Sequence, residues 1–360
     1  MYASGVGLDL NELDRMVQHL LLNKHASNTL RSSMTMFRSW ITFCLAFGLP
    51  LTFQQANSTL ERQLCWYTVF LATGSLQFST VRDYVVIGVQ RWHRQQLVYL
   101  ELSKLPVLSD VLFSVSKCIP KSLKTRLPIS ADMCLQWFDL CDDSSLVDLS
   151  FFCMCAIMMY GCRRLGELAY KRIADFDYRK HLTVDCVRFS ADKQTLFICW
   201  PVTKTRQQGP PLVIPFQRSS GTGFCVVSLM TKYLTMASFS SPLEPLFQRV
   251  SKGVLTGQPL IKDMFIRKMR CYIKATDPTL NVSLFSGHSF RIGAATALSM
   301  QCGLQDNFIK GIGDWLSNCY LRYIRLSLAD KVHAGRSMGQ LFCKLQHSGL
   351  HASHQQLRQT

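Results

Sequence analysis

Acidic residues are scarce in this sequence. Its 360 residues include 23 Asp and Glu against 40 Lys and Arg, which leaves a formal net charge of +17. Because a strong positive charge attracts polyanions, nucleic acid is the first candidate partner and an anionic membrane surface the second. Apolar residues make up 48% of the chain, a composition that excludes a disordered protein and predicts two or three domains with their own cores.

Long apolar runs are also missing. The two longest, residues 40–53 and 149–162, are shorter than the roughly 20 residues that span a bilayer, and Pro50 interrupts the first. The N-terminal residues carry Asp9, Glu12 and Asp14 without an apolar leader segment. We therefore expect core helices in these runs, no secretory signal and no membrane partner.

Motifs for metals and nucleotides are absent as well. The sequence contains no C-x-x-C pair, no Walker-type phosphate loop and no carboxylate cluster of the transposase type. Cys153 and Cys155 lie inside an apolar run, which indicates free buried thiols in a reducing compartment. Three tail histidines at 347, 351 and 354 have a spacing that a metal could use on a helix, but no Cys or carboxylate stands near them. We predict neither a metal nor a cofactor.

The first third of the chain is helical in pattern. Apolar residues recur every three or four positions in residues 10–22, 27–47, 60–71 and 79–96. The predicted organisation is a helical N-terminal domain, a basic linker with prolines, a second domain and a polar tail, over residues 1–115, 116–129, 130–346 and 347–360. Basic side chains on the outer helix faces and in the linker are candidates for phosphate contacts: Arg31, Arg38, Arg82, Arg91, Lys117, Lys121 and Lys124. The alternative for these charges is a solvated face.

The second domain combines helices with a short β-rich region. Helices are expected at residues 130–141, 146–160, 224–237 and 261–274. Between them, β-rich runs at 182–189, 195–202 and 212–216 are separated by polar turns, which predicts a three-stranded antiparallel sheet. The fold class is therefore mainly α with a small antiparallel β-sheet (α+β).

Candidate functional residues are concentrated in three C-terminal pieces. Ser286 precedes an apolar run and predicts a helix start, after which His288 and Arg291 are three residues apart and share one helix face. A helix start has unpaired amide hydrogens and a positive dipole end, so an anion such as phosphate fits there. A second helical segment, expected at 307–327, contains Trp315 and Tyr323. An isolated H-x-x-R is ordinarily a solvated surface pair, and only its combination with Trp315 and Tyr323 indicates a functional site.

In this order the pieces G-H-S-F-R-x-G-A-A-T, G-x-W and R-Y-I-R resemble the tyrosine recombinases of the phage-integrase type. The resemblance is greatest to recombinases of eukaryotic mobile elements such as DIRS-like retroelements and cryptons. Asp314 departs from the pattern, because a basic residue often stands there. The resemblance implies a helical core-binding domain that clamps DNA, followed by a tyrosine recombinase catalytic domain.

The resemblance also implies roles for an upstream arginine box. Arg164-Leu-Gly-Glu167 matches R-x-G-E, which assigns phosphate binding to Arg164 and a supporting role to Glu167, with Arg163 as the fallback. We expect this box on a turn that leads into a helix ending at Asp175. Without the C-terminal pieces, the Arg and Glu would be only a surface pair near a helix cap.

The family further has a mobile hairpin lysine and a nucleophilic tyrosine. Lys204, in the turn between the second and third expected strands, is the preferred hairpin lysine and Lys193 its competitor, while an exposed turn lysine is the plain alternative for both. Tyr323 is the preferred nucleophile because of its R-Y-I-R context, and Tyr320 is the rival.

The resemblance implies cleavage and rejoining of double-stranded DNA through a 3′-phosphotyrosine. Arg164 and Arg291 would hold the phosphate, Trp315 would donate a third contact, His288 would donate or accept a proton, and Lys204 would protonate the leaving 5′ oxygen. The family also implies a homotetramer on two duplexes. A last helix at 326–345 would then dock on a neighbouring protomer or on its own domain.

We expect the protein in the nucleus if its host is eukaryotic, and in the cytoplasm or nucleoid if its host is prokaryotic. Two alternatives remain open at this point: a type IB topoisomerase-like relaxing enzyme, and a catalytically silent, domesticated DNA-binding protein. The complete set of candidate residues disfavours the silent protein.

Overall fold

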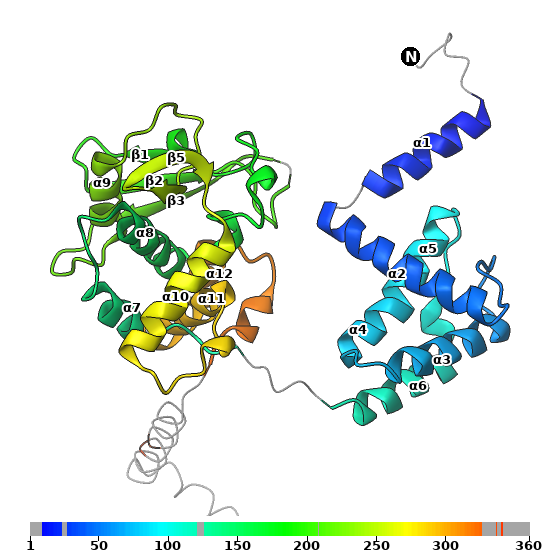
Figure 1. Cartoon of the computed structure of the whole chain (residues 1–360). Coiled ribbons are helices and arrows are strands. Elements are labelled where there is room, and N and C mark those ends of the chain that lie inside the picture. The colour runs from blue at the N-terminus through cyan, green and yellow to red at the C-terminus, as the bar shows by residue number, and fades with distance from the viewer. Residues whose placement is uncertain are drawn as a thin grey trace, which may run out of the picture. The chain divides into compact units, whose positions relative to one another are not determined.

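The computed structural model describes residues 9–23, 27–120, 126–207 and 209–325, together with 336 and 340. The chain divides into two compact units, Met1–Leu123 and Lys124–Thr360, and Figure 1 shows both. The domain boundaries expected from the sequence remain predictions. Lys121, Lys124, the expected helix at 326–345 and the tail histidines lie outside the described residues.

The first unit is all helical where it is described. Its α-helices are α1 (Leu10–Asn23), α2 (Ser27–Ala46), α3 (Ser58–Ala72), α4 (Phe78–Arg82), α5 (Val89–Gln95) and α6 (Pro106–Cys118). Between α4 and α5 the chain continues as a π-helical segment, Asp83–Gly88, so the expected helix at 79–96 forms with altered winding. Trp40, Leu64 and Tyr67 are fully buried and hold α2 against α3.

Helix α6 occupies part of the stretch expected to be a linker. Pro106 stands in its first turn, where a missing amide hydrogen costs nothing, and the helix runs to Cys118. At the other end of that stretch, the amide of Leu127 donates to the Leu284 carbonyl (3.1 Å) and that of Ile129 to the Ser289 carbonyl (3.0 Å). Residues 127–129 are therefore held within the second unit by backbone hydrogen bonds.

The second unit is built around a helix that is buried on every side. Its α-helices are α7 (Ala131–Phe138), α8 (Leu146–Tyr160), α9 (Val226–Met236), α10 (Lys262–Thr276), α11 (Gly287–Thr296) and α12 (Asp306–Gly313). All residues of α8 from Asp148 to Met159 are buried. Because the helix is apolar all round, it can sit only in a core, and α9 and α11 pack against it. Figure 1 shows α8 between the sheet and the α10–α12 layer.

The expected three-stranded antiparallel sheet is confirmed. It has the order β1 (Val187–Phe189), β2 (Thr195–Trp200), β3 (Leu212–Gln217), with Leu196 paired to Phe189 on one side and to Phe216 on the other. The first strand is shorter than expected because Val184–Cys186 forms a 3₁₀ turn. The sheet and the helices together confirm the mainly α class with a small antiparallel sheet.

A second, two-stranded sheet was not expected from the sequence. It is the hairpin of β4 (Gln248–Ser251) and β5 (Val254–Pro259), joined by Lys252 and Gly253, both at positive φ (50° and 79°). Two positive φ angles are what a tight I′ hairpin turn needs, and Lys is a poor signal for one.

Two helix predictions are wrong in detail. After the arginine box the chain forms only the 3₁₀ turns Leu165–Glu167 and Ile173–Asp175. The backbone of Tyr170 forms a β-bridge with Ile261, so it does not form the hydrogen bonds of a helix. The segment expected to be helical at 307–327 is broken at Asp314, whose backbone is left-handed (φ 52°) and ends α12.

Among the described residues, none of the helices has the length and apolar character that crossing a membrane requires.

Candidate active site

The H-x-x-R helix α11 begins as the sequence predicts. The Ser286 hydroxyl accepts a hydrogen bond from the His288 amide (3.3 Å), and the Ser286 amide donates to the Ser289 hydroxyl (3.0 Å), which closes a reciprocal cap. Gly287 lets the helix start approach the arginine box, because a Cβ there would lie 2.6 Å from the Cβ of Leu165. The cap and the close approach fix the position of Arg291 one turn later.

Arg291 ties three separate segments together. Its guanidinium is fully buried, donates to the carbonyl of Cys162 and to that of Gly313 (2.7 Å), and lies 3.9 Å from the ring centre of Trp315. Burial first, and then the positive charges of Arg164 and Arg163, lower its pKa to about 10. The group therefore stays charged at neutral pH. Within the described part of the chain its Nε has no hydrogen-bond partner.

The two neighbouring arginines have different surroundings. Arg163 is fully buried, and it donates to the carbonyls of Gly161 (2.7 Å) and Ile312 (2.6 Å), which makes it a brace between two segments. The Arg164 side chain is 24% exposed and pairs with Glu167 Oε1 (3.0 Å). Glu167 also accepts from the Arg164 backbone amide (3.3 Å), so the carboxylate holds both ends of the residue. The geometry favours Arg164 over Arg163 for an incoming phosphate.

Tyr323 lies among the other candidates. Its ring centre is 4.9 Å from that of His288, 5.6 Å from that of Trp315 and 5.8 Å from the Arg291 guanidinium. The Tyr323 carbonyl accepts from the Thr296 hydroxyl (3.2 Å), which anchors the residue on the last turn of α11. The tyrosine is half-buried.

The rival Tyr320 lies in a different environment. Its side chain is fully buried against Trp315. The carboxylate of Asp306, followed by burial, raises the pKa of Tyr320 to about 12, which makes its hydroxyl harder to ionise. An enclosed tyrosine with a raised pKa is poorly placed to attack a DNA backbone. The surroundings therefore favour Tyr323.

His288 is exposed beside Tyr323, and its environment favours the neutral ring. Burial of part of the ring lowers the pKa of His288, and the charges of Arg291, Arg164, Arg325 and Arg126 lower it further, in that order. A neutral imidazole has a free nitrogen lone pair and can accept a proton. Burial and the local cations together therefore favour a His288 ring that can accept a proton.

Trp315 is packed more deeply than its predicted role requires. It is 5% exposed, and its Nε1 is enclosed without a hydrogen-bond partner among the described residues. Gly313 makes room for it, since a Cβ there would lie 1.9 Å from the indole ring. In this structure the indole supports the Arg291 guanidinium by stacking. Its donation to phosphate remains a prediction.

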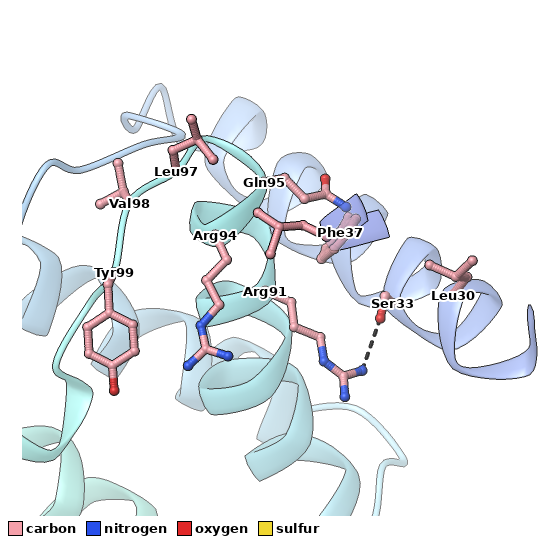
Figure 2. A pocket seen from close by; sticks show the side chains of 10 residues that line it. Leu30, Ser33, Phe37, Arg91, Arg94, Gln95, Leu97, Val98 and Tyr99 are labelled. Atoms are coloured by element: carbon pink, nitrogen blue, oxygen red, sulfur yellow. Dashed lines mark hydrogen bonds between the residues drawn. The ribbon is translucent and has the colours of Figure 1, made fainter. Parts of the chain in front are cut away.

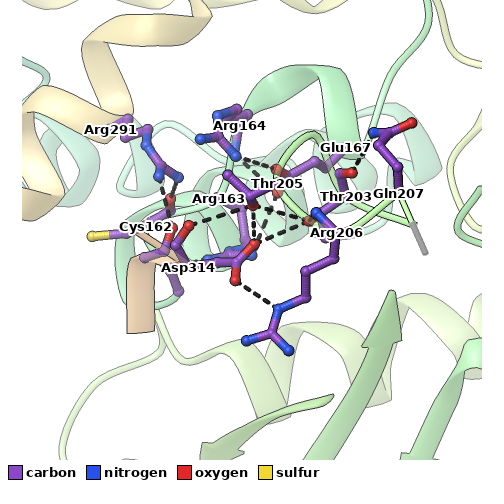
Figure 3. A network of polar contacts seen from close by, with 12 residues as sticks. Cys162, Arg163, Arg164, Glu167, Thr203, Thr205, Arg206, Gln207, Arg291 and Asp314 are labelled. Carbon is purple, nitrogen blue, oxygen red and sulfur yellow. Dashed lines mark hydrogen bonds and ion pairs between the residues drawn. The ribbon is translucent and has the colours of Figure 1, made fainter. Parts of the chain in front are cut away.

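The two candidate lysines lie beyond opposite ends of β2. Lys193 is in the β1–β2 turn at positive φ (56°), and Lys204 is exposed in the loop after β2. A strand rises about 3.3 Å per residue, so six strand residues separate the two turns by about 20 Å. The loop with Lys204 is tied to Asp314, directly before Trp315, by Thr203, Thr205 and Arg206 (Figure 3). This contact with the site favours Lys204.

The tie to Asp314 is the part of the site that the sequence reasoning missed. Asp314 was noted only as a departure from the family pattern. The signal available in the sequence was an acidic residue where the pattern often has a basic one, together with a hydroxyl-rich T-K-T-R loop elsewhere in the chain.

The described DNA-contact candidates of the first unit are on its surface to different degrees. Arg31, Arg38, Arg82 and Lys117 are exposed, and Arg82 pairs with Asp83 (3.4 Å). Arg91 is half-buried and donates to the Ser33 hydroxyl (3.0 Å) at a hollow of about 450 Å³. Figure 2 shows Arg94 on the same side of the hollow, stacked on Tyr99 (5.1 Å). Their contacts with DNA remain predictions.

The described residues contain no group of three His, Cys, Asp or Glu side chains that could hold a metal ion. The fourteen cysteines that the structure describes are all free thiols.

Comparison with solved structures identifies the fold. The Tn1549 transposon integrase in complex with circular intermediate DNA superposes with a TM-score of 0.53 at 15% identity, over 90% of this chain and 99% of that chain. A variant of the same integrase with another circular intermediate DNA gives 0.53 at 13% identity, over 89% and 99%. The lambda integrase dimer bound to a COC′ core site gives 0.47 at 13% identity, over 90% and 78%.

No family model and no curated protein matches the sequence. The chain has the fold of the tyrosine recombinases.

Proposed function

We propose that this protein is a site-specific DNA recombinase that cleaves and rejoins DNA through a 3′-phosphotyrosine at Tyr323. The observation that carries the proposal is the convergence of Tyr323, His288, Arg291 and Trp315, with centre-to-centre separations of 3.9 to 5.8 Å. The Cys162 carbonyl, which accepts from Arg291, links this cluster to the arginine box, and the Gly313 carbonyl links it to the end of α12. The fold shared with the Tn1549 integrase supports the same conclusion.

The phosphate would be held mainly by Arg164. Its guanidinium is partly exposed beside the site, and a guanidinium can bind two phosphate oxygens at once without losing its charge. Arg291 lies beneath with both terminal nitrogens bound to carbonyls, so it contributes chiefly a fixed positive charge. Preorganised charge of this kind stabilises the five-coordinate phosphorus as negative charge builds on its oxygens.

The reaction exchanges one phosphodiester for another, the DNA linkage for a linkage to tyrosine, and it requires proton transfers at the attacking and leaving oxygens. The Tyr323 oxygen forms a bond to phosphorus as the bond to the 5′ oxygen breaks, the tyrosine proton passes to His288, and Lys204 protonates the leaving oxygen. A 5′ hydroxyl from another strand then attacks the phosphotyrosine and reverses each transfer. The energy of the broken bond is kept in the linkage, so these steps balance without a nucleotide.

The wider biological setting belongs to the same proposal. We propose double-stranded DNA as the partner, service to a mobile element, assembly as a homotetramer on two duplexes, and nuclear location in a eukaryotic host. The net charge of +17 supports DNA binding. The likeness of the motifs to DIRS-like and crypton recombinases supports the mobile element, and the Tn1549 protein is a transposon integrase.

The test is covalent trapping. Nicked duplexes, which lose a short strand on cleavage and cannot religate, carry either the ends of the encoding element or a randomised centre. They are incubated with the protein and chelator and run on a denaturing gel. We expect a protease-sensitive shifted band that is absent in Y323F. Y320F is the matched control, because it removes only a buried hydroxyl three residues away and should keep the band.

Each other outcome has a defined meaning. A band that persists in Y323F would refute the assigned nucleophile. Tight, salt-sensitive binding without any band would replace the proposal with the silent DNA-binding protein. A band accompanied by relaxation of supercoiled plasmid, but by no strand exchange between two duplexes, would indicate the type IB topoisomerase-like enzyme.

A further inference from the structure

A buried carboxylate adjoins the candidate active site without a role in the steps described so far. Asp314 is 3% exposed and stands at the end of α12 in a left-handed backbone conformation that Asp tolerates better than most residues. Its carboxylate accepts from the Thr203 hydroxyl (3.0 Å), the Thr205 hydroxyl and Arg206 Nε (2.8 Å). All three donors belong to one loop after β2, more than a hundred residues earlier in the sequence (Figure 3).

The loop closes on itself around Lys204. The Thr203 amide donates to the Arg206 carbonyl (3.1 Å), and the Arg206 amide donates back to the Thr203 hydroxyl (3.1 Å). Gln207 adds a side-chain bond to the Thr203 carbonyl (2.6 Å). Lys204 is the single residue between the two threonines that bind Asp314, and its own side chain is exposed. The position of its backbone is therefore set by Asp314.

On its other side, Asp314 is part of the phosphate-binding cluster. The Gly313 carbonyl just before it accepts from Arg291, and Trp315 just after it stacks on the same guanidinium. The Trp315 amide donates to the Lys310 carbonyl (3.0 Å), which fixes the turn. Asp314 thus joins the β2–β3 loop, which contains Lys204, to Arg291 and its positive charge.

The charge of Asp314 is favoured by its partners. Burial raises the pKa of this carboxyl, but hydrogen bonds from Thr205, Arg206 and Thr203 together outweigh burial and hold the pKa below its usual value. The carboxylate is therefore ionised at neutral pH. A basic residue in its place would face Arg206 and repel the loop.

We propose that Asp314 is a positioning residue that latches the β2–β3 loop to the end of α12 and so holds Lys204 where it protonates the leaving 5′ oxygen. The inference rests on the proposed function and deepens it. In the step concerned, the bond from phosphorus to the 5′ oxygen breaks, the lysine ammonium gives one proton to that oxygen, and the lysine is left as a neutral amine. In the reverse step the amine takes the proton back.

The experiment distinguishes a loss of proton donation by Lys204 from a general loss of activity. The duplex that gives the wild-type adduct is prepared twice, once with its normal phosphodiester and once with sulfur in place of the bridging 5′ oxygen. A thiolate is a far weaker base than an alkoxide and leaves without being protonated. Loss of the proton donor therefore slows cleavage of the oxygen substrate and spares the sulfur substrate.

The variants alter either the acceptor or one of the donors of the hydrogen bonds between Asp314 and the loop. D314N keeps the shape of the side chain but removes its charge, and T205V removes one hydroxyl donor from the loop. Small misplacement of a catalytic group costs up to about 10²-fold in rate. We expect D314N to cut the oxygen substrate about 10²-fold more slowly, T205V to show a smaller loss, and both to approach the wild-type rate on the sulfur substrate, as K204A should.

D192N is the matched control. Asp192 is likewise a turn carboxylate bonded to a serine hydroxyl and to the Gln194 amide (3.0 Å), but it lies beyond the other end of β2. It should leave cleavage of both substrates unchanged. Hydrogen–deuterium exchange gives a readout without DNA, because D314N should accelerate exchange of the Thr203 and Arg206 amides, and D192N should not.

The outcomes distinguish the latch from the reaction itself. If D314N and T205V are equally slow on both substrates, Asp314 acts on Arg291 or Trp315 and the latch is refuted. If both variants cleave the oxygen substrate at the wild-type rate, it is also refuted. If the wild type gives no adduct with either substrate, the proposed function fails, and this inference fails with it.

Discussion

The two turns that flank β2 have similar composition and different anchoring. Each contains a lysine, and in each an aspartate carboxylate accepts hydrogen bonds from a hydroxyl and from a nitrogen of the turn. In the β1–β2 turn the carboxylate is Asp192, which bonds to residues within two positions of itself. In the β2–β3 loop it is Asp314, more than a hundred residues away. The carboxylate of the first turn therefore has local partners, whereas the second loop takes this form only when the whole unit folds.

This contrast is the reason for assigning Lys204, and not Lys193, to the proposed site. The Asp192 carboxylate bonds to its neighbours in sequence, so it does not tie the β1–β2 turn to the candidate site. A loop whose donors end on a distant buried carboxylate is held at the place where that carboxylate lies.

Alanine substitution of each lysine should give the greatest difference. K204A should slow strand cleavage about 10²- to 10⁴-fold, the usual contribution of a positioned general acid. K193A should leave the rate unchanged. Single-turnover adduct formation measures both. Comparable losses in the two variants, or a loss in K193A alone, would assign the hairpin lysine differently.

The end of α12, which receives the loop, can be disturbed without touching a polar group. A Cβ at Gly313 would lie 1.9 Å from the Trp315 ring, whereas one at Gly311 would meet nothing within 4 Å. Overpacking should make G313A less stable by about 3 kcal/mol. G311A should be more stable by about 0.5–1 kcal/mol, because alanine suits a helix better than glycine. Urea unfolding followed by circular dichroism measures both, and a neutral G313A would contradict the packing described.

Removing the distant carboxylate should cost more stability than removing the local one. D314A leaves two threonine hydroxyls and Arg206 without their shared acceptor, and the expected loss is about 2 kcal/mol in the free energy of unfolding. D192A should lose less, because its partners can turn to water. The same unfolding experiment compares them. A larger loss in D192A would mean that the local turn, not the latch, stabilises the sheet.

The smallest expected effect is on pH dependence. Folding lowers the pKa of Asp314 below its ordinary 3.8. Its ionised form therefore stabilises the fold fully above that value, and the contribution is lost as pH falls through the lower pKa of the folded state. The stability difference between wild type and D314N should be constant near neutral pH and shrink below pH 3.8. A difference that grows in acid would mean that folding raises this pKa.

Local signals in the sequence predicted much of the helical structure. The expected helix at 146–160 forms as α8 with those bounds, and Ser286 caps α11 as its position suggested. Predictions failed where distant segments compete for the backbone. The residues after Glu167 have helical periodicity, but Tyr170 pairs with the chain at Ile261 and the helix does not form. The β4–β5 hairpin was missed because Lys252-Gly253 is an uncommon turn pair.

By itself the sequence determined the fold class, the three antiparallel strands and the residue types available for chemistry on phosphate. These follow from periodicity, caps and composition, which act over a few residues. Motif context favoured Arg164, Tyr323 and Lys204 in the sequence, and only the tertiary structure shows how their surroundings differ from those of Arg163, Tyr320 and Lys193. Burial and long-range hydrogen bonds differ between the two members of each pair. Such contacts join residues far apart in the chain. The environment of each residue is therefore determined only when the core has packed.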